Sequence, residues 1–142
     1  MSEITHNITD MARCAAQFRT ERFAPLGLKG CHGSYLAQIC EHPGITQDQL
    51  AKRIFINKSN VARQLVILDE EGFVERRPCC EDKRAMRVYP TPKALDVLPQ
   101  VHEILVEWEN LLTEDLSPGE VELLGKMLGK MKAHAASWME EH

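Results

Sequence analysis

Apolar residues recur at spacings of three and four along most of this chain, which is the periodicity of amphipathic helices. The first such run predicts a helix over residues 7–23, and Pro25 and Gly27 then end it. A second run predicts a helix from Cys31 to Glu41. The chain is therefore expected to begin with two amphipathic helices, whose apolar positions are Ile8, Met11, Ala15 and Phe18, then Tyr35, Leu36 and Ile39.

Two shorter helices are predicted next. Thr46 and Gln49 have the spacing of a capping box, in which each side chain satisfies an unpaired amide of the other residue. Asn57 or Ser59 can cap the following helix, and Gly72 supplies its end. The inward positions of this following helix are Val61, Leu65 and Leu68, and its other face is polar.

Residues 73–77 and 85–89 have the composition of β-strands and flank a charged segment, residues 78–84. They predict a hairpin with a long tip. Two short helices followed by such a hairpin are the element order of a winged helix-turn-helix, a DNA-reading unit.

Two long helices are predicted in the C-terminal part. Thr91-Pro92 begins the first, and Ser117 with Glu120 forms a second capping box that opens the last helix, which ends near Met139. Their apolar positions are Val97, Val101, Ile104, Trp108 and Leu111, then Val121, Leu124, Leu128, Met131, Ala135 and Trp138. The heptad seam of the last helix predicts burial against another helix and favours a homodimer. Packing on the first helix of the same chain is the alternative.

The predicted fold class is therefore mainly α with a small β hairpin. We expect residues 1–142 to form one protomer, with a winged helix-turn-helix over residues 31–93. The N- and C-terminal helices, residues 4–24 and 94–142, are expected to form a helical dimerisation part.

Charge is distributed unevenly along the chain. The formal net charge is −4, but residues 46–93 hold 10 Lys and Arg against 7 Asp and Glu. Because neutralisation of phosphate by Lys and Arg supplies most non-specific affinity for DNA, this local excess matters more than the total. The predicted DNA reader is the basic part of an acidic chain.

Two segments carry a resemblance to a known family. NKSNVARQLVILDEEGFVERRP, followed by EDKRAMRVYPTPKA, is similar to the recognition helix and wing of the MarR family of bacterial winged-helix transcriptional regulators. Asp82 and Arg84 hold the charged positions of the family's wing signature. Pro90 and Ala94 stand where the family usually has Leu and Gly, so the departure concerns the junction between the wing and the next helix.

The resemblance implies a transcriptional regulator, expected to be a repressor that binds a pseudo-palindromic operator in double-stranded DNA as a homodimer. It also implies release by a small-molecule ligand. At the wing, it implies that Arg84 enters the minor groove and that Asp82 orients its guanidinium; a local surface ion pair is the alternative.

Five residues of the fourth predicted helix are free to face a major groove, because the apolar face uses other positions. Arg63 can hold guanine, and Asn60 or Gln64 can hold adenine, while Lys58 and Ser59 are placed for phosphate. On the hairpin, Lys83 and Arg87 are expected to contact the DNA backbone. Arg76 and Arg77 alternate between strand faces, so they cannot both do so. A winged helix that binds protein instead of DNA is the alternative from another class.

Two kinds of signal remain open for the control of binding. A small apolar or aromatic effector would lodge near Phe18, Tyr35, Ile39 and Trp108, although such residues more often belong to the plain core. Oxidation of a thiol is the other signal, and three cysteines are candidates for it. The resemblance points to Cys14, for which a buried structural thiol is the alternative; Cys79 and Cys80 lie among cations, for which exposed loop residues are the alternative.

The sequence offers no catalytic or metal-binding constellation. Cys31-His32 and Cys40-X-His42 lie at opposite ends of one helix, about 13 Å apart, so they cannot share an ion. We therefore expect no enzyme activity, cofactor or metal. The five cysteines form an odd set that is typical of thiols, and no segment is typical of a signal peptide or membrane span, so we expect a cytoplasmic protein.

Overall fold

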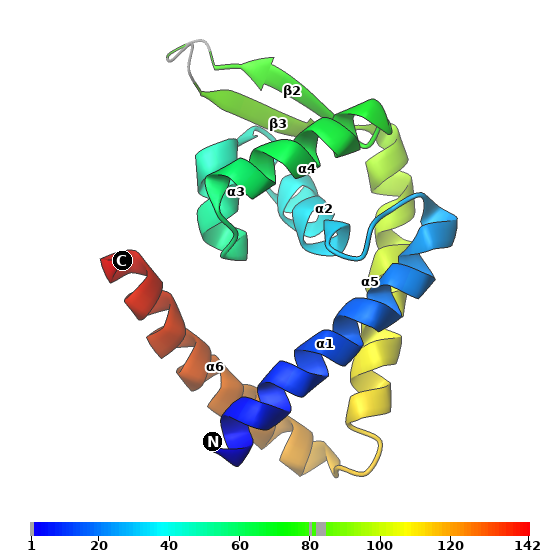
Figure 1. The fold of residues 1–142 in the computed structure, drawn as a ribbon. Coiled ribbons are helices and arrows are strands. Elements are labelled where there is room, and N and C mark those ends of the chain that lie inside the picture. Colours follow the sequence, from blue (N-terminus) through cyan, green and yellow to red (C-terminus); the bar gives the residue numbers. More distant parts are fainter. Residues whose placement is uncertain (1, 80, 82–84) are drawn as a thin grey trace. The chain divides into compact units, whose positions relative to one another are not determined.

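The structure is a computed structural model that describes residues 2–79, 81 and 85–142 (Figure 1). Two compact units are described separately, Met1–Leu105 and Val106–His142, and their boundary falls within a long helix. The elements are α1 (Glu3–Phe23), the 3₁₀ helix η1 (Ala24–Leu26), α2 (His32–Glu41), β1 (Ile45–Thr46), α3 (Gln47–Ile54), α4 (Lys58–Glu70), β2 (Val74–Pro78), β3 (Met86–Pro90), α5 (Pro92–Leu112) and α6 (Pro118–Glu141).

The predicted helix caps are present. In the capping box of α3, Thr46 N–H donates to Gln49 Oε1 at 3.0 Å, and Gln49 N–H donates to Thr46 Oγ1 at 3.1 Å. Asn57, and not Ser59, caps α4, because its Oδ1 accepts from the backbone N–H of Asn60 at 2.8 Å. The capping box that opens α6 is also formed.

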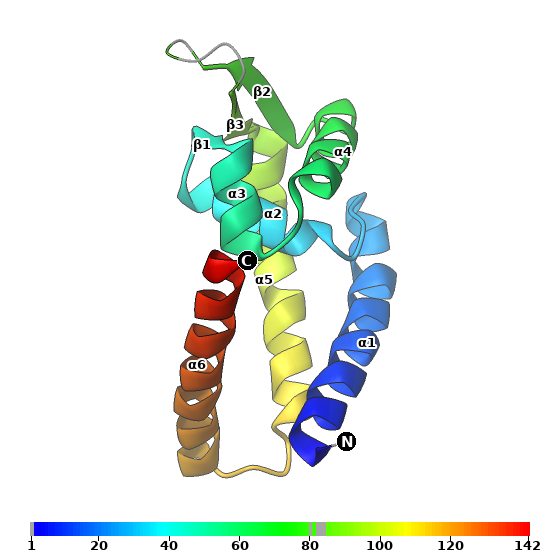
Figure 2. The ribbon, with the colours of Figure 1, turned by 60° about the vertical axis from the view of Figure 1, so that its left-hand side comes forward.

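The sheet has one strand more than predicted. Its order is β1-β3-β2, and all pairs are antiparallel (Figure 2). β1 is only two residues long, Ile45 pairing with Val88 and Thr46 with Arg87, so it has no alternation that a sequence pattern could reveal. The strands of the hairpin each begin one residue later than predicted. α1 likewise begins at Glu3 and not at residue 7, because Ser2 caps it.

The first unit has a continuous apolar core. Val61, Leu65 and Leu68 of α4 are fully buried, as predicted. They join side chains from the end of α1, from α2, α3, the sheet, the residue before β2 and α5, which include Phe23, Tyr35, Leu36, Ile39, Leu50, Phe73, Val88, Ala94 and Val101. Because α4 uses one face for this core, its polar face points away from it.

Other predicted apolar positions are exposed. Ile8 and Met11 of α1 are 42% and 44% exposed. On α6, Leu128, Met131 and Trp138 are 45%, 41% and 58% exposed. Large apolar side chains at this exposure are a feature of surfaces that bind another protein chain. No helix in the described part of the chain is long and apolar enough to cross a membrane.

Candidate nucleic-acid interface

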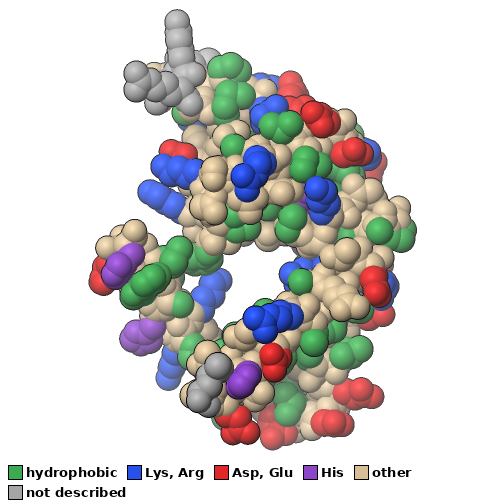
Figure 3. All heavy atoms as spheres, viewed as in Figure 1, with side chains coloured by type: hydrophobic (Ala, Val, Ile, Leu, Met, Phe, Trp, Pro, Cys, Tyr) green, Lys and Arg blue, Asp and Glu red, His purple; other side chains and the backbone are tan. Residues whose placement is uncertain are grey.

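Charge is polarised along α4. Its first half carries Lys58 and Arg63 with no acidic residue in the first turn, whereas its C-terminal end carries Asp69, Glu70 and Glu71. Figure 3 shows Lys and Arg side chains over the face formed by α3 and α4, and acidic side chains gathered where α4 ends near β2. The first half of the helix is therefore the half suited to a polyanion.

The first turn of α4 has two pre-arranged polar side chains. Lys58 Nζ lies 3.3 Å from Asp48 Oδ2 of α3, and both side chains are about two-thirds exposed, at 68% and 66%. Ser59 Oγ donates to Asn57 Oδ1 at 2.8 Å. An exposed ion pair of this kind contributes little stability, so Lys58 can exchange Asp48 for a phosphate at small cost.

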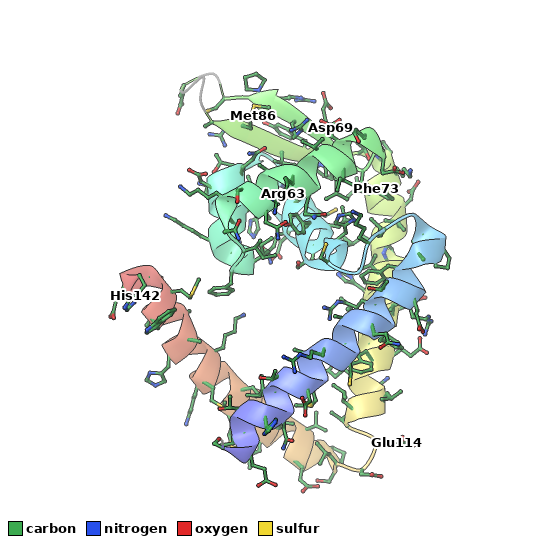
Figure 4. All side chains as sticks on the ribbon, in the orientation of Figure 1. Arg63, Asp69, Phe73, Met86, Glu114 and His142 are labelled. Carbon is green, nitrogen blue, oxygen red and sulfur yellow. The ribbon has the colours of Figure 1, made fainter. Side chains whose placement is uncertain are left out.

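The next turn holds the predicted base-reading pair. An Arg63 Nη2 donor lies 3.4 Å from Asn60 Oδ1, a long contact between side chains three residues apart. Figure 4 shows Arg63 near the middle of α4 and Asp69 farther along the helix towards β2. The structure thus brings the half-buried Asn60 and the exposed Arg63 together on the polar face of α4.

Gln64 differs from its neighbours because its side chain is partly engaged with α2. The backbone N–H of Lys29 donates to His32 Nδ1 at 3.1 Å, so the ring proton is assigned to Nε2, which donates to Gln64 Oε1 at 2.8 Å. Burial lowers the pKa of His32 below its usual value. A neutral imidazole therefore ties the start of α2 to α4, and only the Gln64 amide nitrogen is left for a base.

Sequence reasoning missed this role of His32, which it considered only as a metal ligand. His32 is 2% exposed and lies three residues before Tyr35 on the buried face of α2. That spacing was the available signal, since a buried histidine needs hydrogen-bond partners.

The described cations of the hairpin strands are held by intramolecular contacts. Arg76 Nε bonds Asp69 Oδ2 of α4 at 2.9 Å, and Arg77 lies over the ring of Tyr89 with its guanidinium carbon 4.5 Å from the centroid. Arg87 Nη1 donates to the carbonyl of Gly44 at 2.8 Å, and a hydrogen bond with Cys79 raises the pKa of Arg87. Arg87 therefore links β3 to the residues before β1, and its predicted contact with DNA stays a prediction.

Four of the predicted residues lie outside the described part of the chain. They are Cys80, Asp82, Lys83 and Arg84. Their predicted roles at the tip of the wing stay predictions.

The winged-helix geometry agrees with comparisons with known proteins. A model of the MarR family matches residues 32–86. The uncharacterised HTH-type transcriptional regulator YybA of Bacillus subtilis is 31% identical over 99 residues, which span 70% of this chain and 66% of YybA. The crystal structure of the transcriptional regulator SlyA has a TM-score of 0.92 and 27% identity, with 98% of each chain covered. This chain belongs to the MarR family.

A further MarR family structure is similar in fold. A regulator from Listeria monocytogenes, solved in complex with a 26mer DNA, has a TM-score of 0.89 and 23% identity. The match covers 96% of this chain and 91% of that one.

Two cysteines of this MarR-family chain differ from the alternatives considered for them. Cys79 is not an exposed loop residue, because it is only 7% exposed and its backbone N–H donates to the carbonyl of Ala85 at 2.8 Å. Cys14 is not a buried thiol in this chain, because it is exposed on α1. The next residue, Ala15, is buried, but Ile8 and Met11 earlier on α1 are exposed. Burial on this helix therefore differs from one position to the next.

The predicted effector-lining residues divide between the two units. Tyr35 and Ile39 are fully buried in the core of the first unit, Phe18 is half-buried against that core, and Trp108 lies in the second unit. The Tyr35 hydroxyl has no hydrogen-bond partner among the described residues. Burial, with a smaller effect of Cys31, raises the pKa of Tyr35 to about 12. Tyr35 is therefore a protonated phenol that can donate a hydrogen bond.

Proposed function

We propose that this MarR-family transcriptional regulator is a repressor that binds a pseudo-palindromic operator as a homodimer and is released by a small-molecule ligand. The observation that carries the proposal is the polar face of the first half of α4, which holds Lys58, Asn60 and Arg63 and has no acidic residue in its first turn. A helix of this kind can place Arg63 against guanine and Asn60 against adenine in the major groove, with Lys58 and Ser59 on phosphate.

The wing completes the proposed interface. Lys83 would contact the backbone and Arg84 would enter the minor groove, with its guanidinium oriented by Asp82. The Listeria regulator solved with DNA supports the use of this fold on a duplex.

Exposed apolar side chains support the homodimer. They occur on α1 and α6, and are Ile4, Ile8, Met11, Leu123, Met127, Leu128, Met131 and Trp138. Two-fold pairing through such faces would present two copies of α4 to the two halves of a palindrome.

The test of DNA binding uses the purified protein and a library of genomic fragments that includes its own upstream region. We expect specific footprints of two-fold symmetry and an affinity that falls steeply with salt. Sedimentation of the protein–DNA complex should give two protein chains for each operator site. Absence of specific binding at any salt concentration would instead favour a winged helix that binds protein.

Ligand control is supported by the unpartnered hydroxyl of Tyr35 in the first unit. A small apolar or aromatic ligand with one acceptor would satisfy this hydroxyl, near Ile39 and Phe18 of the same unit. Ligands that release the protein from its operator should lose potency in the Tyr35→Phe variant. Equal potency in that variant would exclude Tyr35 from the site.

The exposure of Cys14 supports a second form of control, by oxidation of its thiol. Peroxide should then weaken operator binding, and dithiothreitol should restore it. The Cys14→Ser variant should bind DNA with the same affinity in the presence and absence of peroxide. If the variant still responds, Cys79 and Cys80 are the remaining candidates.

A further inference from the structure

A hollow of about 540 Å³ lies between the end of α2, β1 and α3. Its volume is within the range of sites for small ligands. All its lining residues lie between His42 and Arg53, within the first unit, and none of them takes part in the DNA contacts proposed above.

The hollow carries positive charge that no lining residue neutralises. Lys52 and Arg53 line it, and no Asp or Glu does. Neither cation has an ion-pair partner among the residues that the structure describes. On α3, Asp48 is already paired with Lys58 at 3.3 Å. Two uncompensated cations on one concave surface favour an anion.

Arg53 is held in place by neutral groups. Its Nε donates to Gln38 Oε1 at 2.7 Å, and its Nη2 lies 2.9 Å from His42 Nε2. Because a guanidinium can only donate, His42 accepts at Nε2 and is therefore neutral in this contact. The two contacts fix the guanidinium and leave its charge uncompensated, which is the pre-organisation that a binding site needs.

The opposite wall is also fixed. Gly44 adopts φ +89°, its N–H bonds the Val88 carbonyl at 2.8 Å, and its own carbonyl accepts from Arg87 Nη1 at 2.8 Å. A Cβ at Gly44 would come within 3.4 Å of the Tyr89 ring. Pro43 and Ile45 flank Gly44 and add apolar surface to the hollow.

We propose that this hollow binds a small organic anion. Its carboxylate or phosphate would be held by the fork of Arg53 and the ammonium of Lys52, and a short apolar body would lie against Pro43 and Ile45. The shared chemistry is an anionic oxygen group, which a free metabolite or a DNA phosphate could supply. Concavity and the apolar wall favour the free organic anion.

The experiment titrates the whole protein, without DNA, at constant ionic strength. The probes are butyrate, butyl phosphate and the neutral isostere butyramide. Binding is measured as chemical-shift changes of the backbone amides of Gly44, Gln49 and Arg53. We expect saturable shifts with the two anions and none with butyramide. The double variant Lys52→Gln/Arg53→Gln should lower the affinity at least about tenfold, the equivalent of about 1.4 kcal/mol.

The control variant Lys130→Gln/Lys132→Gln removes the same charge from exposed positions of α6 and should bind as the parent does. Arg53→Lys keeps the charge without the fork and should bind with intermediate affinity. Equal shifts with butyramide, shifts that do not saturate, or an equal loss in the control would overturn the proposal.

A separate titration with operator DNA distinguishes the two sources of the anion. If Lys52 and Arg53 instead hold DNA phosphates, the double variant should reduce the salt slope by roughly 0.9 for each lost contact. That result, together with no binding of the small anions, would overturn the proposal. Small-anion binding with an unchanged salt slope supports it. The first titration contains no DNA, so it tests anion binding even if the protein is not a DNA-binding repressor.

Discussion

The two compact units bury their apolar residues to very different extents. In the first unit, α4 places Val61, Leu65 and Leu68 in a core with no exposure. In the second, α6 leaves Leu128 45% and Trp138 58% exposed. Both helices have helical periodicity, so periodicity alone does not say whether a seam is covered within the chain. The difference teaches that the apolar face of α4 is covered within the first unit, whereas the apolar seam of α6 is left exposed among the described residues.

Removal of core volume from α4 should have the largest effect. Leu65→Ala should reduce the free energy of unfolding by about 2–5 kcal/mol, because Leu65 is fully buried and its loss leaves a cavity. Urea denaturation measures this. Val66→Ala is the matched control on the same helix, since Val66 is 38% exposed and should cost well under half as much. Equal costs would show that the core does not extend along one face of α4.

A charge in the seam of α6 should act on assembly and not on folding. Leu128→Lys should convert dimer to monomer at micromolar concentrations, because it places a charge in a surface that the dimer would bury. Analytical ultracentrifugation measures the mass, and the helical circular dichroism of the whole protein should persist. Lys130→Gln, on the same helix, should leave the dimer intact. A monomeric parent protein would contradict the proposed role of the seam.

Removal of a base-reading side chain should weaken specificity. Arg63→Ala should cost about 1–3 kcal/mol of operator binding and relax the preference at one base pair. Fluorescence anisotropy on operator and scrambled duplexes at fixed salt measures both effects. Lys58→Ala is the comparison, because loss of a phosphate contact weakens both duplexes alike. An Arg63→Ala variant with unchanged discrimination would remove Arg63 from the reading pair.

Loss of the cap should have a smaller effect on α4. Asn57→Ala should cost about 1 kcal/mol of stability, because the N–H of Asn60 loses its acceptor. Ser59→Ala should cost less, since Ser59 donates to the cap and does not itself cap the helix. Urea denaturation of the two variants checks the order, and the reverse order would assign the cap to Ser59.

The smallest expected effect is a pH dependence of stability. Burial lowers the pKa of His32 in the folded protein, so between that pKa and 6.5 the unfolded chain binds more protons. Stability should therefore be fully present above about pH 6.5 and be lost as the pH falls towards the folded pKa. His32→Gln should flatten this part of the profile, whereas His102→Gln, at an exposed position, should leave it unchanged. A parent profile flat between pH 7 and pH 5 would contradict the prediction.

Local signals predicted much of the fold. Thr46 with Gln49 and Ser117 with Glu120 form the capping boxes that their spacing indicated. Such caps involve residues only three apart, so they depend little on the rest of the chain. The strand β1 was not predicted, because its two residues are paired only through contact with β3, more than forty residues later.

The candidate DNA-binding site was likewise predicted only in part from the sequence. The polar face of α4 follows from which positions are apolar, so Lys58, Ser59, Asn60 and Arg63 could be selected from the sequence. The contact of Gln64 with His32 joins residues 32 positions apart, and no local pattern encodes it. The burial of Cys79 and the exposure of Cys14 depend likewise on which neighbouring segments cover each residue.

By itself, the sequence determined the family, the order of the elements, the helix caps and the polar face of α4, because each depends on neighbouring residues or on a fixed periodicity. Only the tertiary structure decided that Arg87 reaches the Gly44 carbonyl, that His32 holds Gln64, and that Arg53 is clamped above a hollow without a counter-charge. Each of these contacts joins two segments that are separated in the sequence and that only folding brings together, so no local sequence pattern predicts it.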